Sequence, residues 1–231
     1  MKTHIKYGLL AFFLFISFQS YAQSIEQLVK QVRERLDQVV DYEADGIMKT
    51  NVSFLKIPVS KITMYYKKPN KLKLKSASGF SFLPKGAVNI NMNQLLQDDN
   101  YTIIDAGTEV WKGVNVRIAK LLPQNDDDDI VLSTLYIDPI NRVILKSKTT
   151  TRENGSFELE MKYGKYIGMA LPDKINFTFH TKDYKLPKGL TFDFDDGKKA
   201  SGVKKNPTKG MAEITIKSYK LNKGVSDQIF K

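Results

Sequence analysis

The 231-residue sequence contains no cysteine. Disulfide bonds, thiolate metal sites and a lipidated cysteine at a processed N-terminus are therefore excluded. Histidine is almost absent as well, and His180 is the one histidine that follows the N-terminal residues. Zinc sites of the usual kinds need three or four nitrogen or sulfur ligands. The composition therefore predicts no metal site, and no motif in the chain points to a cofactor.

Motifs of covalent chemistry are missing too. The chain has no G-x-S-x-G elbow and no G-x-x-x-x-G-K-[ST] phosphate loop. His180 alternates with phenylalanines and is expected to face solvent, not to act as a general base. The acidic run 126–129 and the stretch 193–197 lack calcium-loop spacing. Glu158 and Glu160 are expected to be surface charges. These absences argue against an enzyme.

The apolar run near the N-terminus is too short to cross a bilayer. It extends from Gly8 to Phe18 after two lysines, about half of the roughly 20 residues that a spanning helix needs. Small residues follow, ending at Ala22, as at a signal-peptide cleavage site. We expect residues 1–22 to be a signal peptide cleaved after Ala22, and residues 23–231 to form a single domain.

The formal net charge is +11, with few acidic residues to balance the lysines. Such an excess of positive charge is often found in proteins that bind nucleic acids. Export argues against that partner, so we expect none. A basic exported surface meets anionic lipid headgroups or simply keeps the protein soluble. Trp111, the only tryptophan, is expected in the core or a cavity wall, because most rings occupy the face opposite the lysines.

One amphipathic helix is expected at the start of the mature chain. Ser24 is a good N-cap, Gln27 stands three residues later, and apolar residues follow at helical spacing. The predicted helix extends from Ile25 to about Val40. Further short helical turns are expected at 92–98 and in the stretch SDQIF near the end. The polar stretch 195–210 is expected to be a loop.

Most of the remaining chain alternates apolar and polar residues with period two, which is typical of strands with one buried face. Turn sequences such as KKPNK, DPINR, RENGS and LPDK separate the runs. We predict a mainly β (α+β) fold of about ten antiparallel strands in meander order. The clearest apolar positions are Met48, Val52 and Phe54; Ile62, Met64 and Tyr66; Phe157, Leu159, Met161 and Tyr163; and Ile175, Phe177 and Phe179.

The predicted sheet is too wide for one helix to cover. Ten strands at about 4.8 Å spacing make a sheet nearly 50 Å wide, whereas a helix covers roughly 10 Å. Either the sheet curls onto itself or apolar surface remains as a cavity for a ligand or partner. The residues expected to line the core or this cavity are Met48, Val52, Phe54, Met64, Leu72, Leu74, Phe157, Leu159, Phe177 and Phe179.

Several stretches resemble the LolA-like periplasmic carriers and sorting proteins of outer-membrane lipoproteins. They are the helix SIEQLVKQVRERLDQVVDYEADGIM, the hairpin MYYKKPNKLKLKS, the strands TLYIDPINRVILKSKTTTRENGSFELEMKYGKY, and the stretches LPDKINFTF and LNKGVSDQIF. The resemblance implies a periplasmic protein whose incomplete antiparallel barrel wraps around lid helices. It implies a hydrophobic cavity for lipoprotein acyl chains or another lipid, and transfer partners in the inner and outer membranes.

The resemblance also implies a candidate for the lid latch. In the family an arginine directly before the hairpin proline holds the lid, and Lys68 stands at this position, before Pro69. Lysine lacks the planar, multi-donor fork of arginine, so an identical latch is not expected.

The leading hypothesis is a non-enzymatic carrier that holds acyl chains and passes them toward the outer membrane. A second hypothesis is an envelope sensor or interaction module of the same fold that binds a protein partner. A third hypothesis is an enzyme that acts on lipid or glycan. The missing pair of nucleophile and base argues against it.

Overall fold

The computed structural model describes residues 23–51, 59–77, 96, 101–125, 129–152, 155–180 and 209–231. The expected signal peptide and its cleavage after Ala22 lie outside these ranges and stay predictions. So do two of the expected lining residues, Val52 and Phe54, and most of the expected loop at 195–210.

Helix α2 (Ile25–Asp37) begins where the sequence predicts. The side-chain oxygen of Ser24 accepts a hydrogen bond from the backbone N–H of Gln27 at 3.2 Å, which satisfies one free donor of the first turn. The helix ends at Asp37, slightly before the expected end near Val40. Val39 leaves the helix yet remains buried. The predicted helix is thus confirmed, with its last turn corrected.

Ten antiparallel strands form one open sheet, as the alternating sequence predicts. The strands are β1 (Asp41–Asn51), β2 (Ser60–Lys67), β3 (Lys71–Ser76), β4 (Tyr101–Trp111), β5 (Val114–Pro123), β6 (Ile130–Asp138), β7 (Val143–Thr151), β8 (Ser156–Lys162), β9 (Lys174–His180) and β10 (Lys209–Leu221). Two short 3₁₀ helices, η2 (Ile167–Met169) and η3 (Asp227–Phe230), complete the described elements. The second confirms the helical turn expected in SDQIF.

The strand order corrects the expected meander at one place. The order is β3-β2-β1-β10-β9-β8-β7-β6-β5-β4, so β1 pairs with β10, and β3 and β4 are the two edges. Met48 lies opposite Ile214 and Gly46 opposite Ile216, which joins two apolar faces into one. Because hairpin turns specify only neighbours along the chain, this long-range pairing has no local signal.

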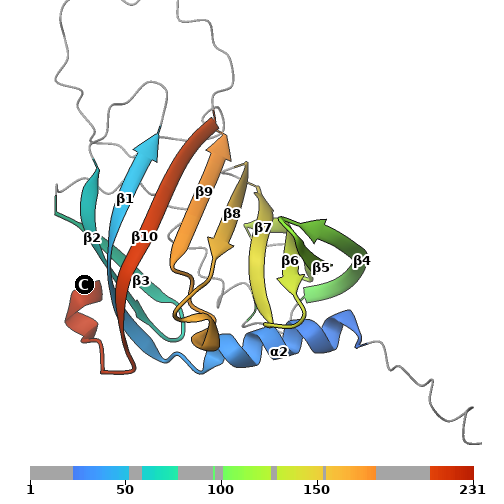
Figure 1. The fold of residues 1–231 in the computed structure, drawn as a ribbon, viewed down its shortest axis with the longest axis horizontal. Helices are drawn as coiled ribbons and strands as arrows, with labels where there is room; N and C mark the ends of the chain where they lie inside the picture. The colour runs from blue at the N-terminus through green and yellow to red at the C-terminus, as the bar shows by residue number, and fades with distance from the viewer. Residues whose placement is uncertain are drawn as a thin grey trace, which may run out of the picture.

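Curvature of the sheet comes from irregular pairing within the strands. The register shifts between Asp45 and Gly46, and again in the β4–β5 and β6–β7 pairs. Such bulges bend a strand and increase its twist. At Gly46 a Cβ atom would lie 2.6 Å from the carbonyl oxygen of Thr215, so this bend requires glycine. Figure 1 shows the result: the sheet curves so that β2 and β3 pass behind it, and α2 lies across the ends of the strands.

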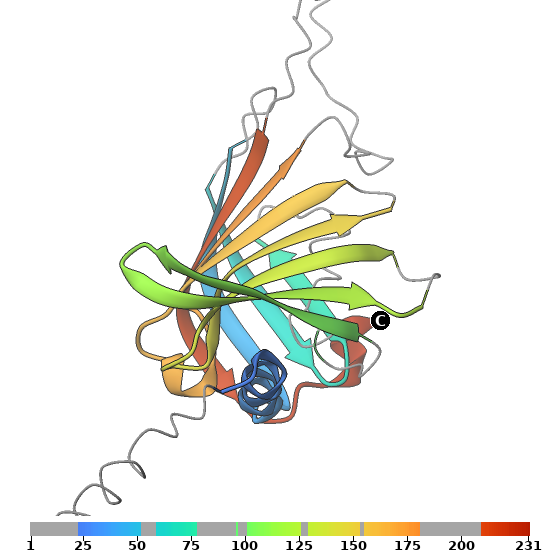
Figure 2. The same ribbon diagram turned by 90° about the vertical axis from the view of Figure 1, so that its right-hand side faces the viewer.

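The buried side chains form clusters along the inner face. One lies between the apolar face of α2 and strands β5 to β7; a second lies within β1, β2 and β10. In Figure 2, viewed nearly along α2, the strands fan around the interior and leave the sheet open between β3 and β4. Among the described helices, none has the length and apolar character of a membrane span.

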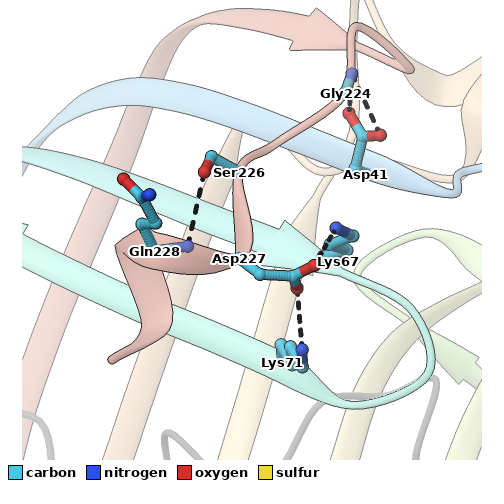
Figure 3. Close-up of polar contacts among 7 residues, drawn as sticks. All are labelled: Asp41, Lys67, Lys71, Gly224, Ser226, Asp227 and Gln228. Carbon is cyan, nitrogen blue, oxygen red and sulfur yellow. Dashed lines mark hydrogen bonds and ion pairs between the residues drawn. The ribbon is translucent and has the colours of Figure 1, made fainter.

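The C-terminal segment 222–231 lies on the outer face of the β2–β3 hairpin (Figure 3). The Asp227 carboxylate accepts bonds from Lys67 at 2.9 Å and from Lys71 at 2.7 Å. The carboxylate of Asp41 accepts bonds from the backbone N–H of Gly224 at 3.1 and 3.2 Å. Lys67 and Lys71 therefore face outward and hold η3.

Trp111 occupies the outer face, contrary to the expected core or cavity position. Its ring centroid lies 5.8 Å from that of Tyr136, and the ammonium of Lys146 lies 4.5 Å from the ring centroid. Lys146 pairs with Glu160 across the β7–β8 ladder, on the side opposite Leu159. Trp111 ends the edge strand β4, which is exposed along most of its length, and it packs on aromatic and lysine side chains of the outer face.

Candidate ligand cavity

A cavity of about 140 Å³ lies where the second half of α2 meets the inner face of the sheet. The spacing of the lining residues matches the elements that carry them. Val32 and Leu36 lie one turn apart on the same face of α2, and the strands contribute alternate residues. The lining residues are Val32, Leu36, Val39, Tyr42, Met64, Tyr66, Leu72, Val143, Ile144, Leu159, Met161, Tyr163, Met169, Ala170, Leu171, Pro172, Ile175, Phe177 and Ile214. None of these described residues carries a charge.

The cavity volume decides what this conformation can hold. An engineered cavity of about 150 Å³ in another protein stays dry and binds benzene. A cavity of about 140 Å³ therefore admits a ring-sized apolar group, and a long acyl chain needs its walls to move. Met64, Met161 and Met169 line the cavity, and their unbranched thioether side chains change rotamer readily. The walls are thus built from side chains that can make room.

Tyrosines form one side of the cavity. The rings of Tyr42 and Tyr66 lie 5.2 Å apart, and Tyr219 packs edge-on against Tyr42 at 5.4 Å. The hydroxyl of Tyr219 donates to the carbonyl of Pro172 at 2.7 Å, and that of Tyr163 donates to the carbonyl of Ile144 at 2.9 Å.

The tyrosine hydroxyls remain uncharged. Burial raises the pKa of Tyr42, Tyr163 and Tyr219 well above the ordinary value, because a phenolate would lose its hydration. The wall therefore offers weakly polar edges to a ligand, with no charge at any physiological pH.

The described residues expected to line the cavity divide into two groups. Met64, Leu72, Leu159 and Phe177 line it. Met48, Leu74, Phe157 and Phe179 also lie on the inner face but pack within the apolar interior: Phe179 stacks on Phe177 at 5.4 Å, and Phe157 lies 5.7 Å from the same ring. Whether any of the eight contacts a ligand stays a prediction.

Lys68 reaches the end of α2. Its ammonium group donates to the backbone carbonyl of Asp37 and to the Asp37 carboxylate, both at 2.7 Å. A cation at this position also complements the negative end of the helix dipole. The β2–β3 hairpin is thus tied to the helix that covers the cavity, at the position that the family resemblance indicates. A latch function for Lys68 stays a prediction.

Arg35 makes more hydrogen bonds than Lys68, and the sequence did not predict them. Its guanidinium donates to the carbonyl of Asn141, to that of Ile167 at 2.9 Å and to that of Gly168 at 2.8 Å. These bonds join α2 to the β6–β7 turn and to η2. All three acceptors are main-chain carbonyls, so no side-chain pattern could have indicated them.

The described part of the chain contains no group of three or more His, Asp or Glu side chains placed to hold a metal ion. The lining residues offer a ligand apolar contact and weak hydrogen bonding.

An apolar cavity under a helix, inside an open antiparallel sheet, defines the class: a half-barrel with a helix across its inner face. Comparison with solved structures identifies it as the LolA-like fold. A LolA superfamily protein from Nitrosomonas europaea has a TM-score of 0.54 and 10% identity, over 88% of this chain and 97% of that one. A putative outer membrane lipoprotein-sorting protein domain from Vibrio parahaemolyticus has a TM-score of 0.51 and 11% identity, over 87% and 94%.

A protein of the DUF1329 family from Desulfovibrio piger shares the fold too, with a TM-score of 0.56 and 12% identity over 88% of this chain and 95% of that one. No protein-family model and no curated protein matches the sequence. At these identities the likeness shows the fold alone, and it confirms the fold that the sequence resemblance implies.

Proposed function

We propose that this protein is a non-enzymatic periplasmic carrier, made with a cleaved signal peptide, that binds lipoprotein acyl chains or another lipid and passes them toward the outer membrane. The observation that carries the proposal is the uncharged cavity under α2. The LolA-like fold supports it, because similar structures include a putative lipoprotein-sorting domain.

Burial of hydrocarbon suffices to hold such a cargo. Each methylene removed from water contributes about 0.8 kcal/mol, so even part of an acyl chain is retained measurably. No bond needs to form or break. Transfer to a partner in either membrane requires only that the partner offers a better apolar site.

A full chain needs more space than the cavity offers in this conformation, and we infer that α2 moves to provide it. The polar ties of Arg35 and Lys68 would resist this movement. The apolar face of α2 would not resist the movement, because contact with the ligand can replace its contact with the sheet.

Two leucines of β3 provide a matched test of the cavity. Leu72 and Leu74 are both half-buried on the inner face, but only Leu72 lines the cavity. We expect Leu72→Glu to abolish binding of the neutral apolar dye N-phenyl-1-naphthylamine, because a carboxylate would stand in the apolar wall. Leu74→Glu should lower the free energy of unfolding but leave dye binding by the folded protein. Equal dye binding by both variants would show that the dye, and any lipid, binds elsewhere.

The natural cargo is identified by mass spectrometry of organic extracts from protein purified without detergent. A stoichiometric lipid or acylated peptide would support the carrier. An empty protein that co-purifies with a membrane protein would favour the interaction module instead. Turnover of a lipid or glycan that His180→Ala abolishes would favour an enzyme.

A further inference from the structure

A second hollow, of about 570 Å³, lies on the outer side of the same strands. Its walls come from the β4–β5 turn and from the ends of β8 and β9, which lie beside α2 in Figure 1. Met161 and Tyr163 line both this hollow and the inner cavity. Strand β8 ends at Lys162, so the two spaces approach each other at the rim of the sheet, beside η2.

The walls of the hollow carry excess positive charge. Lys112, Lys162 and Lys174 line it, against one carboxylate, that of Glu160. Lys162 and Lys174 stand directly opposite each other in the β8–β9 ladder, and like charges in this arrangement destabilise a sheet. The cluster would be stabilised by an anion between the two strands.

The existing ion pairs leave one of these lysines uncompensated. Lys112 bonds Glu160 at 2.6 Å, and Lys174 bonds Glu213 at 2.7 Å. For Lys162, no carboxylate among the described residues lies within ion-pair distance. The free positive charge therefore lies where the hollow meets the rim.

Asn176 adds an unused hydrogen-bond acceptor to the same wall. Its side-chain oxygen is buried and has no hydrogen-bond partner among the described residues. A buried acceptor without a partner costs free energy, which a hydroxyl donor from a ligand would recover. The hollow thus offers an anion-binding pair of lysines and, one alternate position along β9, an acceptor for a hydroxyl group.

We propose that this hollow binds the phosphoglycerol headgroup of an anionic lipid whose hydrocarbon chain lies in the inner cavity. The phosphate lies between Lys162 and Lys174, and a glycerol hydroxyl donates to the side-chain oxygen of Asn176. The inference rests on the proposed function, because the chain must enter beneath α2 past Met161 and Tyr163. It adds the class of cargo: an acidic glycerophospholipid in preference to a zwitterionic one.

Trp111 provides the readout, since it lines the hollow and is the only tryptophan of the chain. The full chain is titrated with soluble dihexanoyl-phosphatidylglycerol and dihexanoyl-phosphatidylcholine while tryptophan fluorescence is followed. We expect tighter binding of phosphatidylglycerol, and a loss of about tenfold in Lys162→Gln, as a charge-assisted bond disappears. Added salt should reduce the preference.

The matched control is Lys120→Gln. Lys120 is exposed on β5 between the buried residues Ala119 and Leu121, so it also points outward, but it does not line the hollow. This variant should leave both affinities unchanged. Dihexanoyl-phosphatidylmethanol, which has the same charge and no hydroxyl, should bind more weakly than phosphatidylglycerol, and Asn176→Ala should remove that difference.

Three results would overturn the proposal in distinguishable ways. Equal affinity for the two lipids, unaffected by Lys162→Gln while the neutral dye still binds, rejects the headgroup site and leaves the carrier intact. Absence of both lipid and dye binding rejects the carrier as well. Saturable binding of free glycerol phosphate without binding of the lipid reassigns the hollow to a small soluble anion.

Discussion

Two segments cover opposite sides of the sheet, and they are held by different forces. Helix α2 covers the inner face with four buried apolar side chains, Ile25, Leu28, Val29 and Val32. The segment 222–231 covers part of the outer face, and its helix η3 has no buried residue. Ion pairs and hydrogen bonds hold this outer segment.

The difference bears on the proposed entry of a ligand beneath α2. Apolar contact is non-directional, so α2 can exchange the sheet for a hydrocarbon chain without losing burial. An ion pair requires one particular partner at one distance and weakens in salt. We call α2 the inner cover and the segment 222–231 the outer cover. The inner cover is therefore held strongly, by apolar contacts that a hydrocarbon ligand could replace. The outer cover is held more weakly, by polar contacts with particular partners.

The largest expected effect is the loss of a buried side chain of α2. Leu28 is fully buried, so Leu28→Ala should lower the free energy of unfolding by about 2–5 kcal/mol in urea titrations. Phe230→Ala, which removes a half-buried ring from the outer cover, is the matched control and should cost much less. A comparable loss in both variants would contradict the distinction between the two covers.

The next effect concerns the main-chain anchor of the outer segment. The carboxylate of Asp41 is buried and accepts bonds from the backbone N–H groups of Lys223 and Gly224. Asp41→Ala should cost about 1.5–3 kcal/mol, because these bonds are charge-assisted. Hydrogen exchange should accelerate at both amides. Glu43→Gln, which removes only a surface ion pair on the same strand, should leave those exchange rates unchanged.

A smaller effect is expected at the polar ties of α2. Arg35→Lys replaces a fork that reaches three carbonyls by a single ammonium group, at a cost of about 1–2 kcal/mol. Uptake of N-phenyl-1-naphthylamine in stopped flow should become faster, because α2 moves more easily. Lys30→Gln changes an exposed residue of α2 and should not alter the rate. An unchanged rate in Arg35→Lys would show that these ties do not limit entry.

The smallest effect is electrostatic and lies in the outer cover. Hydrogen bonds from Lys71 and Lys67 lower the pKa of Asp227 to about 2. Because the folded pKa lies below the unfolded one, the stabilisation is complete above about pH 4 and is lost as the pH falls toward 2. A carboxyl ¹³C NMR titration should show this low midpoint, and Lys71→Gln should move it upward. A midpoint near the ordinary value would mean that η3 is detached in solution.

The parts of the fold that depend on local pattern could be predicted from the sequence. The start of α2 follows from Ser24 and the apolar spacing behind it, and the strands follow from alternation with period two. The pairing of β1 with β10 could not be predicted, because alternation shows which face a residue occupies but not which strand lies beside it. The prediction for Trp111 was wrong because it relied on the general placement of aromatic rings, whereas Trp111 ends an edge strand that is exposed along most of its length.

Core and cavity wall share one sequence pattern. Met48 and Met64 both lie on the inner face, but only Met64 lines the cavity. The difference depends on where α2 crosses the sheet. The Arg35 bonds that join α2 to η2 reach main-chain carbonyls, which have no signature in the sequence, and Lys68 was indicated only by the family resemblance.

The position of β10 between β1 and β9 also sets a time order for assembly. Tyr42 pairs with Leu221, so the sheet stays in two unconnected parts until its last strand in sequence is present. Contacts of such long sequence separation make folding slow. Under the proposed export from the N-terminus, the cavity therefore could not form while the chain was still crossing the membrane. The proposed cargo would then be collected afterwards, by the completely folded molecule.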